Sequence, residues 1–560
     1  MKVTASHHQA EMISHRRDAI AFSFLLKYEL LIPLTLFIVF LSIALPGISW
    51  GAPATWHPDE IVVRSIKALH GEWRFDEINF DYPSLPQYAM FFLGKLVLAL
   101  GGADGEILIA SRVLSAVLAG LTIVLTYFIT RRVGANIYIA GLSGLLLLCV
   151  SELQHNGRFA HNDTYVTFFV TLTVLFLVNY WKSDHRAWLY ASFISIGMAA
   201  SSKYNAISFV LVPIFLYLFS HRSSLRKRPL RILETLFIGG ALTFLGFAAG
   251  TPKSLFWMSY YFKRMIPALV RTGNYARQPD SVRGALGQYF SFADGIGLPL
   301  FILFSAALIW AIYKIFQAFY LKQTENKSQA NFLLILLLSI LALDLPIMFS
   351  YNYPTRFFLP MMPIFAVLAA LFIKDIYEFA HRKGNPYSQR LLNAALAVLI
   401  LFSFARNLSV MLLFLNDARI PASAFVRTLP PDTSLEHTLY PPTIPANHFE
   451  REHNYPIHFI KVLGGGVPTS SRYVFNAGET GLDERLTDFL ITDSFTWSRF
   501  GDPYICETMQ VECEFFKQLE TGQSNHYRLI SEFTYSLPSY LPQMKIAFVN
   551  PGIRIYERIR

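Results

Sequence analysis

The sequence predicts a mainly α-helical protein that crosses a membrane about eleven times and ends in a small α/β domain. Hydrophobic residues make up 53% of the 560 positions and charged residues only 15%, whereas soluble globular chains carry about 25% charged residues. The apolar residues gather in separate long runs, and these runs stop near residue 410. This balance excludes a soluble globular enzyme, a disordered chain and a nucleic-acid-binding tail protein.

Each apolar run is judged against a bilayer core about 30 Å thick, which needs roughly 17 to 25 apolar residues per helix. The run at Pro86–Leu100 is shorter and follows a Pro-rich turn, so we predict an interfacial or re-entrant helix there. We expect spans near Leu30–Leu45, Glu106–Thr130, Ile137–Val150, Thr164–Trp181, Ala187–Ala200, Tyr204–Phe219, Ile232–Gly250, Gly297–Phe319, Phe332–Phe349, Phe357–Ile373 and Leu391–Val410.

Basic residues in the short loops indicate the orientation of the chain, because Lys and Arg collect on the cytoplasmic side. With the N-terminus inside, the inner loops hold Arg131, Arg186 and Lys383 and the densest basic run, 222–228. The sequence therefore predicts a cytoplasmic segment over 1–28, a transmembrane domain over 29–410 and an extracytoplasmic domain over 411–560. We expect a multi-pass protein of the cell (inner) membrane whose first apolar stretch is a retained anchor.

The last 150 residues read as a mixed domain with Pro- and Gly-rich turns. The segments Phe489–Thr492 and Lys545–Val549 predict short strands. Cys506 and Cys513 could form a local disulfide on an oxidising outer face, or could remain two free thiols. The third cysteine, Cys149, lies within a predicted span.

Acidic and histidine side chains mark the first outer loop. His57, Asp59 and Glu60 follow the first span, and Asp81 and Tyr82 lie further along the same loop. A helix start after Pro58 would also place acids in its first turn, against the helix dipole. Both a helix cap and a chemical site are therefore open interpretations of this motif.

The short second outer loop carries Arg158, His161 and Asp163. Asp163 could cap the next span, because Asp is a favoured N-cap residue. Two outer loops nevertheless each bring a carboxylate to one face of the membrane. Asp59 and Asp163 could share general-base duty or hold a divalent metal ion between them.

Cations are expected on the same face. Lys203 and Arg356 both lie at the outer ends of predicted spans, and basic groups at this depth suit a lipid phosphate. The alternative is snorkelling, in which a long basic side chain only reaches toward water. We favour phosphate binding for Lys203 and Arg356 and snorkelling for Lys95 and Lys253.

In order and spacing, these motifs resemble the GT-C glycosyltransferases, specifically the protein O-mannosyltransferase and aminoarabinose transferase type. The resemblance extends over about residues 30 to 375 and implies a GT-C bundle with interfacial helices in its first outer loop. It rests on Asp59-Glu60, 80–83, Arg112, 158–163, Lys203 and 356–363.

The resemblance implies transfer of a sugar from a polyprenyl-phosphate donor to an acceptor on the extracytoplasmic face, with inversion. The acceptor would be a glycolipid, a polysaccharide or a protein. Asp59, Glu60 and Asp163 would be catalytic, with Asp59 as the base. The donor or its phosphate would be bound by His57, Asp81, Tyr82, Arg158, His161, Lys203 and Arg356. Tyr82 departs from relatives that carry Lys beside the acid, which leaves more of the phosphate charge to Lys203 and Arg356.

The alternative function is a transporter or flippase of a lipid-linked or small polar substrate. Such proteins place ionisable groups near the middle of the membrane. Here Glu234 and Asp344 lie toward the ends of their spans. We therefore favour the transferase, with membrane lipids and no nucleic acid among its partners.

Overall fold

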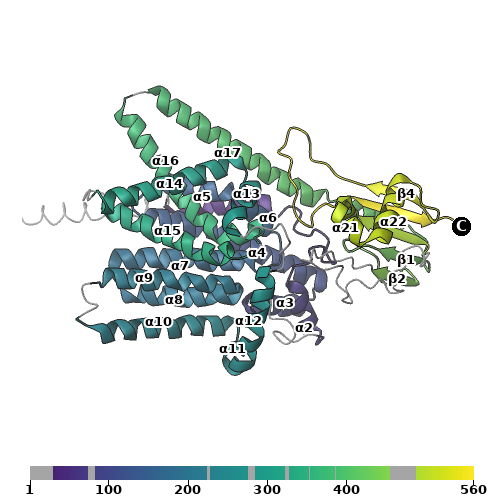
Figure 1. The fold of residues 1–560 in the computed structure, drawn as a ribbon, viewed down its shortest axis with the longest axis horizontal. Helices are drawn as coiled ribbons and strands as arrows, with labels where there is room; N and C mark the ends of the chain where they lie inside the picture. Colours follow the sequence, from purple (N-terminus) through teal and green to yellow (C-terminus); the bar gives the residue numbers. More distant parts are fainter. Residues whose placement is uncertain are drawn as a thin grey trace, which may run out of the picture.

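A bundle of long helices carries a smaller domain of sheet and short helices at one end (Figure 1). The structure is a computed structural model. It describes residues 29–72, 82–222, 227–274, 284–321, 327–351, 353–384, 386–454 and 487–560.

Seven helices of the described residues are long and apolar enough to cross a membrane. They are α4 (Asp104–Arg132), α7 (Asp163–Ser183), α10 (Pro229–Gly250), α14 (Leu298–Phe319), α15 (Lys327–Met348), α16 (Met362–Arg382), which follows the 3-10 turn η3 (Thr355–Met361), and α17 (Pro386–Leu415), which precedes α18 (Arg419–Val426). Shorter helices lie between these seven in the sequence or before them. They are Glu29–Ala44, α3 (Leu85–Ala99), α5 (Ile137–Leu148), α8 (Arg186–Ser202) and η1 (Tyr204–Val210) with α9 (Leu211–Ser220).

A helix lies at every place where the sequence predicts a span, and α3 lies where we predict an interfacial helix. The predicted fold class, a mainly helical membrane bundle with a small C-terminal sheet domain, is confirmed. The number of crossings stays a prediction, because only seven of the described helices meet the criteria of length and composition. The predicted domain boundary at residue 410 falls inside α17, which continues to Leu415.

Helices α8 and α10 pack closely because each carries a glycine where they cross. A Cβ atom on Gly197 would lie 2.1 Å from the carbonyl oxygen of Thr243, and one on Gly246 would lie 2.4 Å from that of Ile194. Small residues let two helix backbones approach this closely. Because α8 ends one residue before Lys203, this crossing helps to position that lysine.

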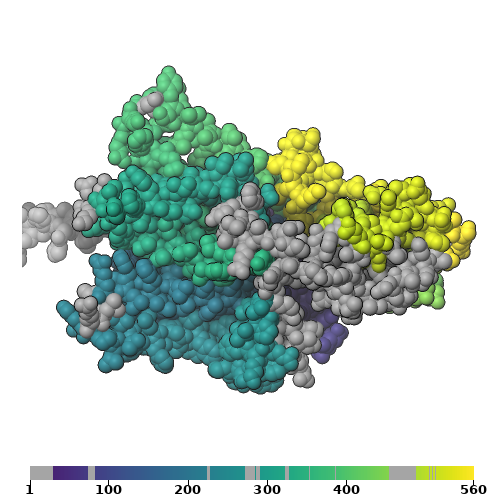
Figure 2. Space-filling view, viewed as in Figure 1, coloured from purple at the N-terminus to yellow at the C-terminus, as the bar shows by residue number. Residues whose placement is uncertain are grey.

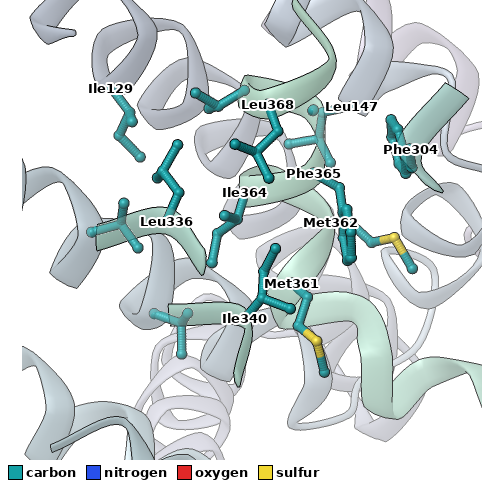
Figure 3. Close-up of a cluster of buried hydrophobic side chains, with 14 of the residues drawn as sticks. Ile129, Leu147, Phe304, Leu336, Ile340, Met361, Met362, Ile364, Phe365 and Leu368 are labelled. Atoms are coloured by element: carbon teal, nitrogen blue, oxygen red, sulfur yellow. The ribbon is translucent and has the colours of Figure 1, made fainter. Parts of the chain in front are cut away.

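A hydrophobic core fills the space between α4, α5, α14, α15 and α16 (Figure 3). Met361 and Met362, at the junction of η3 and α16, are buried in it. The turn η3 carries Arg356, so the packing of this core fixes the backbone beside that cation. The other labelled members are Ile129, Leu147, Phe304, Leu336, Ile340, Ile364, Phe365 and Leu368.

Short helices connect the long ones near the C-terminal domain (Figure 1). They are α2 (Val62–Leu69), α6 (Ser151–Asn156), α11 (Lys253–Phe256), α12 (Met258–Asn274) and α13 (Gly284–Ile296). The helices α2 and α3 pack against each other and against α4. They confirm the helices predicted in the first outer loop.

The C-terminal domain contains a mixed five-stranded sheet in the order β2-β1-β3-β5-β4. Its strands are β1 (Ser434–His437), β2 (Arg451–Asn454), β3 (Phe489–Asp493), β4 (Tyr527–Phe533) and β5 (Ile553–Arg558). Strand β1 is parallel to β2 and β3, whereas β5 is antiparallel to β3 and β4. The short helices of the domain are α20 (Ser494–Trp497), η4 (Ser498–Gly501), α21 (Pro503–Thr508) and α22 (Gln510–Thr521).

Two sequence predictions in this domain have different outcomes. The strand predicted at Phe489–Thr492 is confirmed as β3. The strand predicted at Lys545–Val549 is wrong, because this segment turns. Phe548 has a φ of 65°, a left-handed conformation that a strand does not tolerate. Cys506 and Cys513 are joined by a disulfide between α21 and α22, which decides between the two alternatives.

Buried polar contacts join the C-terminal domain to the first outer loop. The indole nitrogen of Trp50 donates to Asp417 Oδ2 at 2.8 Å, and the Arg419 guanidinium is ion-paired with the same carboxylate at 2.8 Å. Arg419 also donates to the carbonyl oxygen of Phe548 at 2.8 Å. These contacts hold the turn at Phe548 against the segment that contains Trp50 and His57. The C-terminal domain lies at one end of the bundle (Figure 2).

Candidate active site

One guanidinium connects the two carboxylates that the sequence predicts as partners. Arg356 Nη2 lies 2.8 Å from Asp59 Oδ2, and Arg356 Nε lies 3.9 Å from Asp163 Oδ2. Asp59 comes from the first outer loop, Asp163 begins α7 and Arg356 lies in η3. The fold therefore brings together three predicted site residues that are far apart in the sequence.

Asp163 is held by two further predicted residues. Its Oδ1 accepts a hydrogen bond from Lys203 Nζ at 2.5 Å, and its Oδ2 lies 2.7 Å from His161 Nδ1. Asp163 is 1% exposed. If a neutral His161 donates from Nδ1, its Nε2 is a hydrogen-bond acceptor. That buried Nε2 has no partner among the described residues, so it can accept a hydrogen bond from a substrate hydroxyl.

The cations are fixed by the elements that carry them. Thr355, the residue before Arg356, donates its hydroxyl to Glu152 Oε1 at 2.9 Å. Gly295 of α13 leaves room for this turn, because a Cβ there would lie 2.9 Å from the Thr355 side chain. The Lys203 ammonium lies 3.9 Å from the centre of the Phe357 ring, a favourable cation–π distance.

Asp59 remains ionised in this setting. Burial alone would raise the pKa of Asp59, but the Arg356 guanidinium outweighs burial and holds it below its ordinary value. The Asp59 side chain is 29% exposed. An ionised, accessible carboxylate of this kind can accept a proton from an approaching hydroxyl.

His57 positions the loop that carries Asp59. Its Nδ1 accepts the backbone N–H of Asp59 at 3.1 Å, and burial holds the pKa of His57 well below its ordinary value. The neutral ring therefore carries its proton on Nε2. It packs 4.2 Å from the Phe159 ring and 5.0 Å from the Phe548 ring, so the C-terminal domain forms part of this wall.

Glu60 is buried beneath the site and is saturated with donors. Arg112 of α4 forms two bonds to it, Nε to Oε1 at 2.7 Å and Nη2 to Oε2 at 2.7 Å. The backbone N–H of Ala160 donates to Oε1 at 2.9 Å, which links the first outer loop to the second. Both Glu60 and Arg112 are 0% exposed as side chains, so these contacts indicate a positioning role for Glu60.

Replacing Glu60 should therefore damage stability before it affects chemistry. We expect Glu60→Ala to cost about 3–5 kcal/mol, because it leaves Arg112 buried without its partner. Thermal unfolding of the purified protein in detergent measures the effect, with the exposed Glu72→Ala as the matched control. An unchanged melting temperature in Glu60→Ala would contradict this structural role.

Two other predicted phosphate ligands lie differently. Arg158 is buried and donates to the carbonyl oxygens of Ile43 and Pro46, at the end of the first helix. Its contacts among the described residues are those of a structural cap and do not include Lys203 or Arg356. Tyr82 lies beside the site, with its ring 5.5 Å from that of His161; burial, then Asp59, raises the pKa of Tyr82. Asp81 lies outside the described residues.

The predicted metal ligands have other partners in this arrangement. Arg356 is bound to Asp59, while Lys203 and His161 occupy the oxygens of Asp163. The described residues contain no group of three His, Cys, Asp or Glu side chains that could hold a metal ion. The donor set as it stands does not fit a metal, which would have to displace Arg356, and we derive no step through one.

Sequence reasoning misses the residues that the C-terminal domain contributes. Phe548 contacts His57, and its ring lies 5.4 Å from that of Tyr440. Neither residue belongs to a recognisable sequence motif, because its position beside the site depends on how the C-terminal domain packs against the helical bundle. Glu152 is also missed as the anchor of η3, although it lies in the polar second outer loop.

Comparison with known proteins supports the fold. Residues 104–247, which include Asp163 and Lys203, match the model of the dolichyl-phosphate-mannose-protein mannosyltransferase family. No curated protein matches the chain.

Among solved structures, the apo oligosaccharyltransferase of Archaeoglobus fulgidus is similar with a TM-score of 0.51 and 13% identity, over 95% of this chain and 89% of that one. ArnT from Cupriavidus metallidurans bound to undecaprenyl phosphate has a TM-score of 0.49 and 13% identity, over 92% of this chain and 97% of that one. The Saccharomyces cerevisiae Pmt1-Pmt2 complex bound to its sugar donor has a TM-score of 0.32 and 19% identity, over 42% of this chain and 34% of that one. The predicted GT-C fold is thus confirmed, and residues 104–247 are similar to the mannosyltransferase family.

Proposed function

We propose that the protein transfers a sugar from a polyprenyl-phosphate carrier to an acceptor hydroxyl, with Asp59 as the general base. The observation that carries this proposal is the juxtaposition of Asp59, Arg356, Asp163 and Lys203 at the outer end of the bundle. It places a proton acceptor beside two cations that can hold a phosphate. The matched mannosyltransferase segment supports a lipid-phosphate donor.

In the proposed reaction, the acceptor oxygen attacks C1 of the sugar from the face opposite the phosphate. The new C1–O bond forms as the bond from C1 to the phosphate oxygen breaks, and the acceptor proton passes to Asp59. The polyprenyl phosphate leaves with the bonding electron pair and is held by Arg356 and Lys203. A phosphate departs as a stabilised anion, so the leaving group needs no strong acid. The displacement inverts the configuration at C1.

Arg356 has two roles in this proposal. In the empty site it neutralises Asp59, and when the donor enters, the phosphate competes for the same guanidinium. As Arg356 turns to the phosphate, Asp59 loses its strongest favourable partner and its pKa rises. Donor binding therefore makes Asp59 a better base at the moment when the acceptor proton must be removed.

The other residues hold the site in place. Glu60 and His57 position the loop of Asp59, and Asp163 orients Lys203 and His161. His161 Nε2 is the proposed acceptor for a substrate hydroxyl. The disulfide in the C-terminal domain supports an extracytoplasmic active site, because such bonds persist in oxidising compartments.

Mass spectrometry of glycans from cells with and without the gene tests this function. We expect cells without it to lack one sugar on a glycolipid, polysaccharide or protein and to accumulate the polyprenyl-phosphate sugar. Loss of a flippase would also leave the acceptor unglycosylated, but the donor would then accumulate on the cytoplasmic face. Identical glycans in both cells would remove the basis of the proposal.

Lys203 should act on the donor rather than on the acceptor. We expect Lys203→Ala to raise the KM for the donor about tenfold or more, because it removes one charge-assisted contact to the phosphate. The KM for the acceptor should change little. Lys253→Ala is the matched control, because Lys253 lies over Trp257 and outside this cluster. Equal donor KM values in the two variants would argue against the clamp.

Chelation tests the metal version of the site. We expect treatment with EDTA to leave the transfer rate unchanged, because Arg356 and Lys203 already neutralise the two carboxylates. Loss of activity that a divalent cation restores would be the opposite result. It would return Asp59 and Asp163 to the role of metal ligands, with Arg356 displaced.

A further inference from the structure

A polar cavity lies where α7 and α9 end and α8 and α10 begin. This is the end of the bundle opposite the C-terminal domain (Figure 1). Its volume is about 340 Å³. Asp163 begins α7 and Tyr180 lies in its last turn, so the cavity is about 25 Å from the candidate active site. It is lined by Tyr180, Asp184, Arg186, Tyr217, His221, Arg228, Arg231 and Ile232.

The lining carries an excess of positive charge. Arg186, Arg228 and Arg231 line the cavity together with one carboxylate, that of Asp184. In the part of the chain that the structure describes, none of these three guanidinium groups forms an ion pair. The fourth basic group, His221, is bonded through Nδ1 to the carbonyl oxygen of Tyr217 at 3.0 Å. The cavity thus offers three positively charged guanidinium groups as hydrogen-bond donors to a ligand.

A buried hydroxyl points to a ligand more directly. Tyr180 is 1% exposed, and its hydroxyl group has no hydrogen-bond partner among the described residues. The neighbouring Tyr217 hydroxyl donates to Thr235 at 3.0 Å and is satisfied. Buried polar groups are nearly always hydrogen-bonded, so the Tyr180 hydroxyl lacks a partner that a bound oxygen acceptor would supply.

We propose that this cavity binds a phosphate group, namely that of an anionic lipid headgroup. Phosphate oxygens accept several hydrogen bonds from arginine in a geometry that suits the guanidinium. The adjoining surface of α10 is apolar and open, with Leu230 80%, Leu233 62% and Phe237 78% exposed. Acyl chains can lie along this surface while the headgroup enters the cavity. Arg186 and Arg228, which the sequence predicts to lie in cytoplasmic loops, thereby also line this site.

Binding to the full-length protein in detergent tests the proposal, by native mass spectrometry and by the shift in Tm. The probes are phosphatidylglycerol, zwitterionic phosphatidylcholine, and inorganic phosphate as the soluble source. Two variants remove the site: the double variant Arg186→Gln/Arg231→Gln, and Tyr180→Phe, which deletes only the unpartnered hydroxyl. Arg222→Gln is the matched control, because it lies at the same end of the bundle but does not line the cavity.

We expect wild type and Arg222→Gln to retain phosphatidylglycerol in preference to phosphatidylcholine. The double variant should bind phosphatidylglycerol at least about tenfold more weakly, and Tyr180→Phe should bind it more weakly while keeping its Tm without lipid. Stabilisation by inorganic phosphate alone, with no effect of phosphatidylglycerol, would overturn the lipid assignment. Equal binding by all four proteins would overturn the site itself. Neither result depends on sugar transfer.

Discussion

Asp59→Asn should abolish most sugar transfer while leaving the protein folded and inserted. Asparagine keeps the size of the side chain and can still contact Arg356, but it cannot take a proton from the acceptor. Loss of general-base catalysis typically costs about 10²–10⁴-fold in rate. The expected change is in kcat, because the phosphate clamp remains.

The measurement is turnover by the purified variant against wild type, with Tm and expression level as controls for folding. Asp163→Asn is the informative companion. It should also lose activity, but through Lys203 and His161, which it holds at 2.5 and 2.7 Å, so its donor KM should rise as well. Near-normal turnover in Asp59→Asn would remove Asp59 from the role of base.

Arg356→Gln should have the second-largest effect, and its signature is a change in pH dependence. Asp59 acts in its ionised form, so the rate falls as the pH drops through its pKa. Arg356 holds that pKa below its ordinary value, so removing the guanidinium raises it. The acidic limb of kcat/KM, which reports the free enzyme, should therefore move to higher pH.

The same variant should raise the donor KM by about tenfold or more, because it removes a charge-assisted contact to the phosphate. Arg427→Gln, an exposed arginine of the C-terminal domain, is the matched control and should change neither quantity. An acidic limb that stays in place in Arg356→Gln would show that Asp59 is not the titrating base.

Much of the candidate site could be predicted because charge is scarce in this chain. Asp163, Lys203 and Arg356 lie at the ends of apolar runs and Asp59 follows the first run, so the predicted topology places all four on one face of the membrane. The structure brings these four together. Their individual partners could not be read from the sequence, since the pairing of Asp59 with Arg356 depends on how η3 packs against α13.

The sequence does not distinguish an arginine that binds substrate from one that is structural. Arg158 and Arg112 both lie near the predicted site in the sequence. One caps the carbonyl oxygens at the end of the first helix, and the other binds Glu60 in a fully buried pair. Phe548 could not be predicted at all, because its segment has the pattern of a strand and turns only where it docks against Trp50 and His57.

The most direct test of the account is transfer by the purified protein with substrates from cells that lack the gene. Both the donor lipid and the unmodified acceptor should accumulate in such cells. We expect wild type to add a single sugar mass to the acceptor fraction and to release polyprenyl phosphate, whereas Asp59→Asn should do neither. If wild type adds no sugar, or Asp59→Asn adds it at the same rate, the proposed transfer at Asp59 is contradicted.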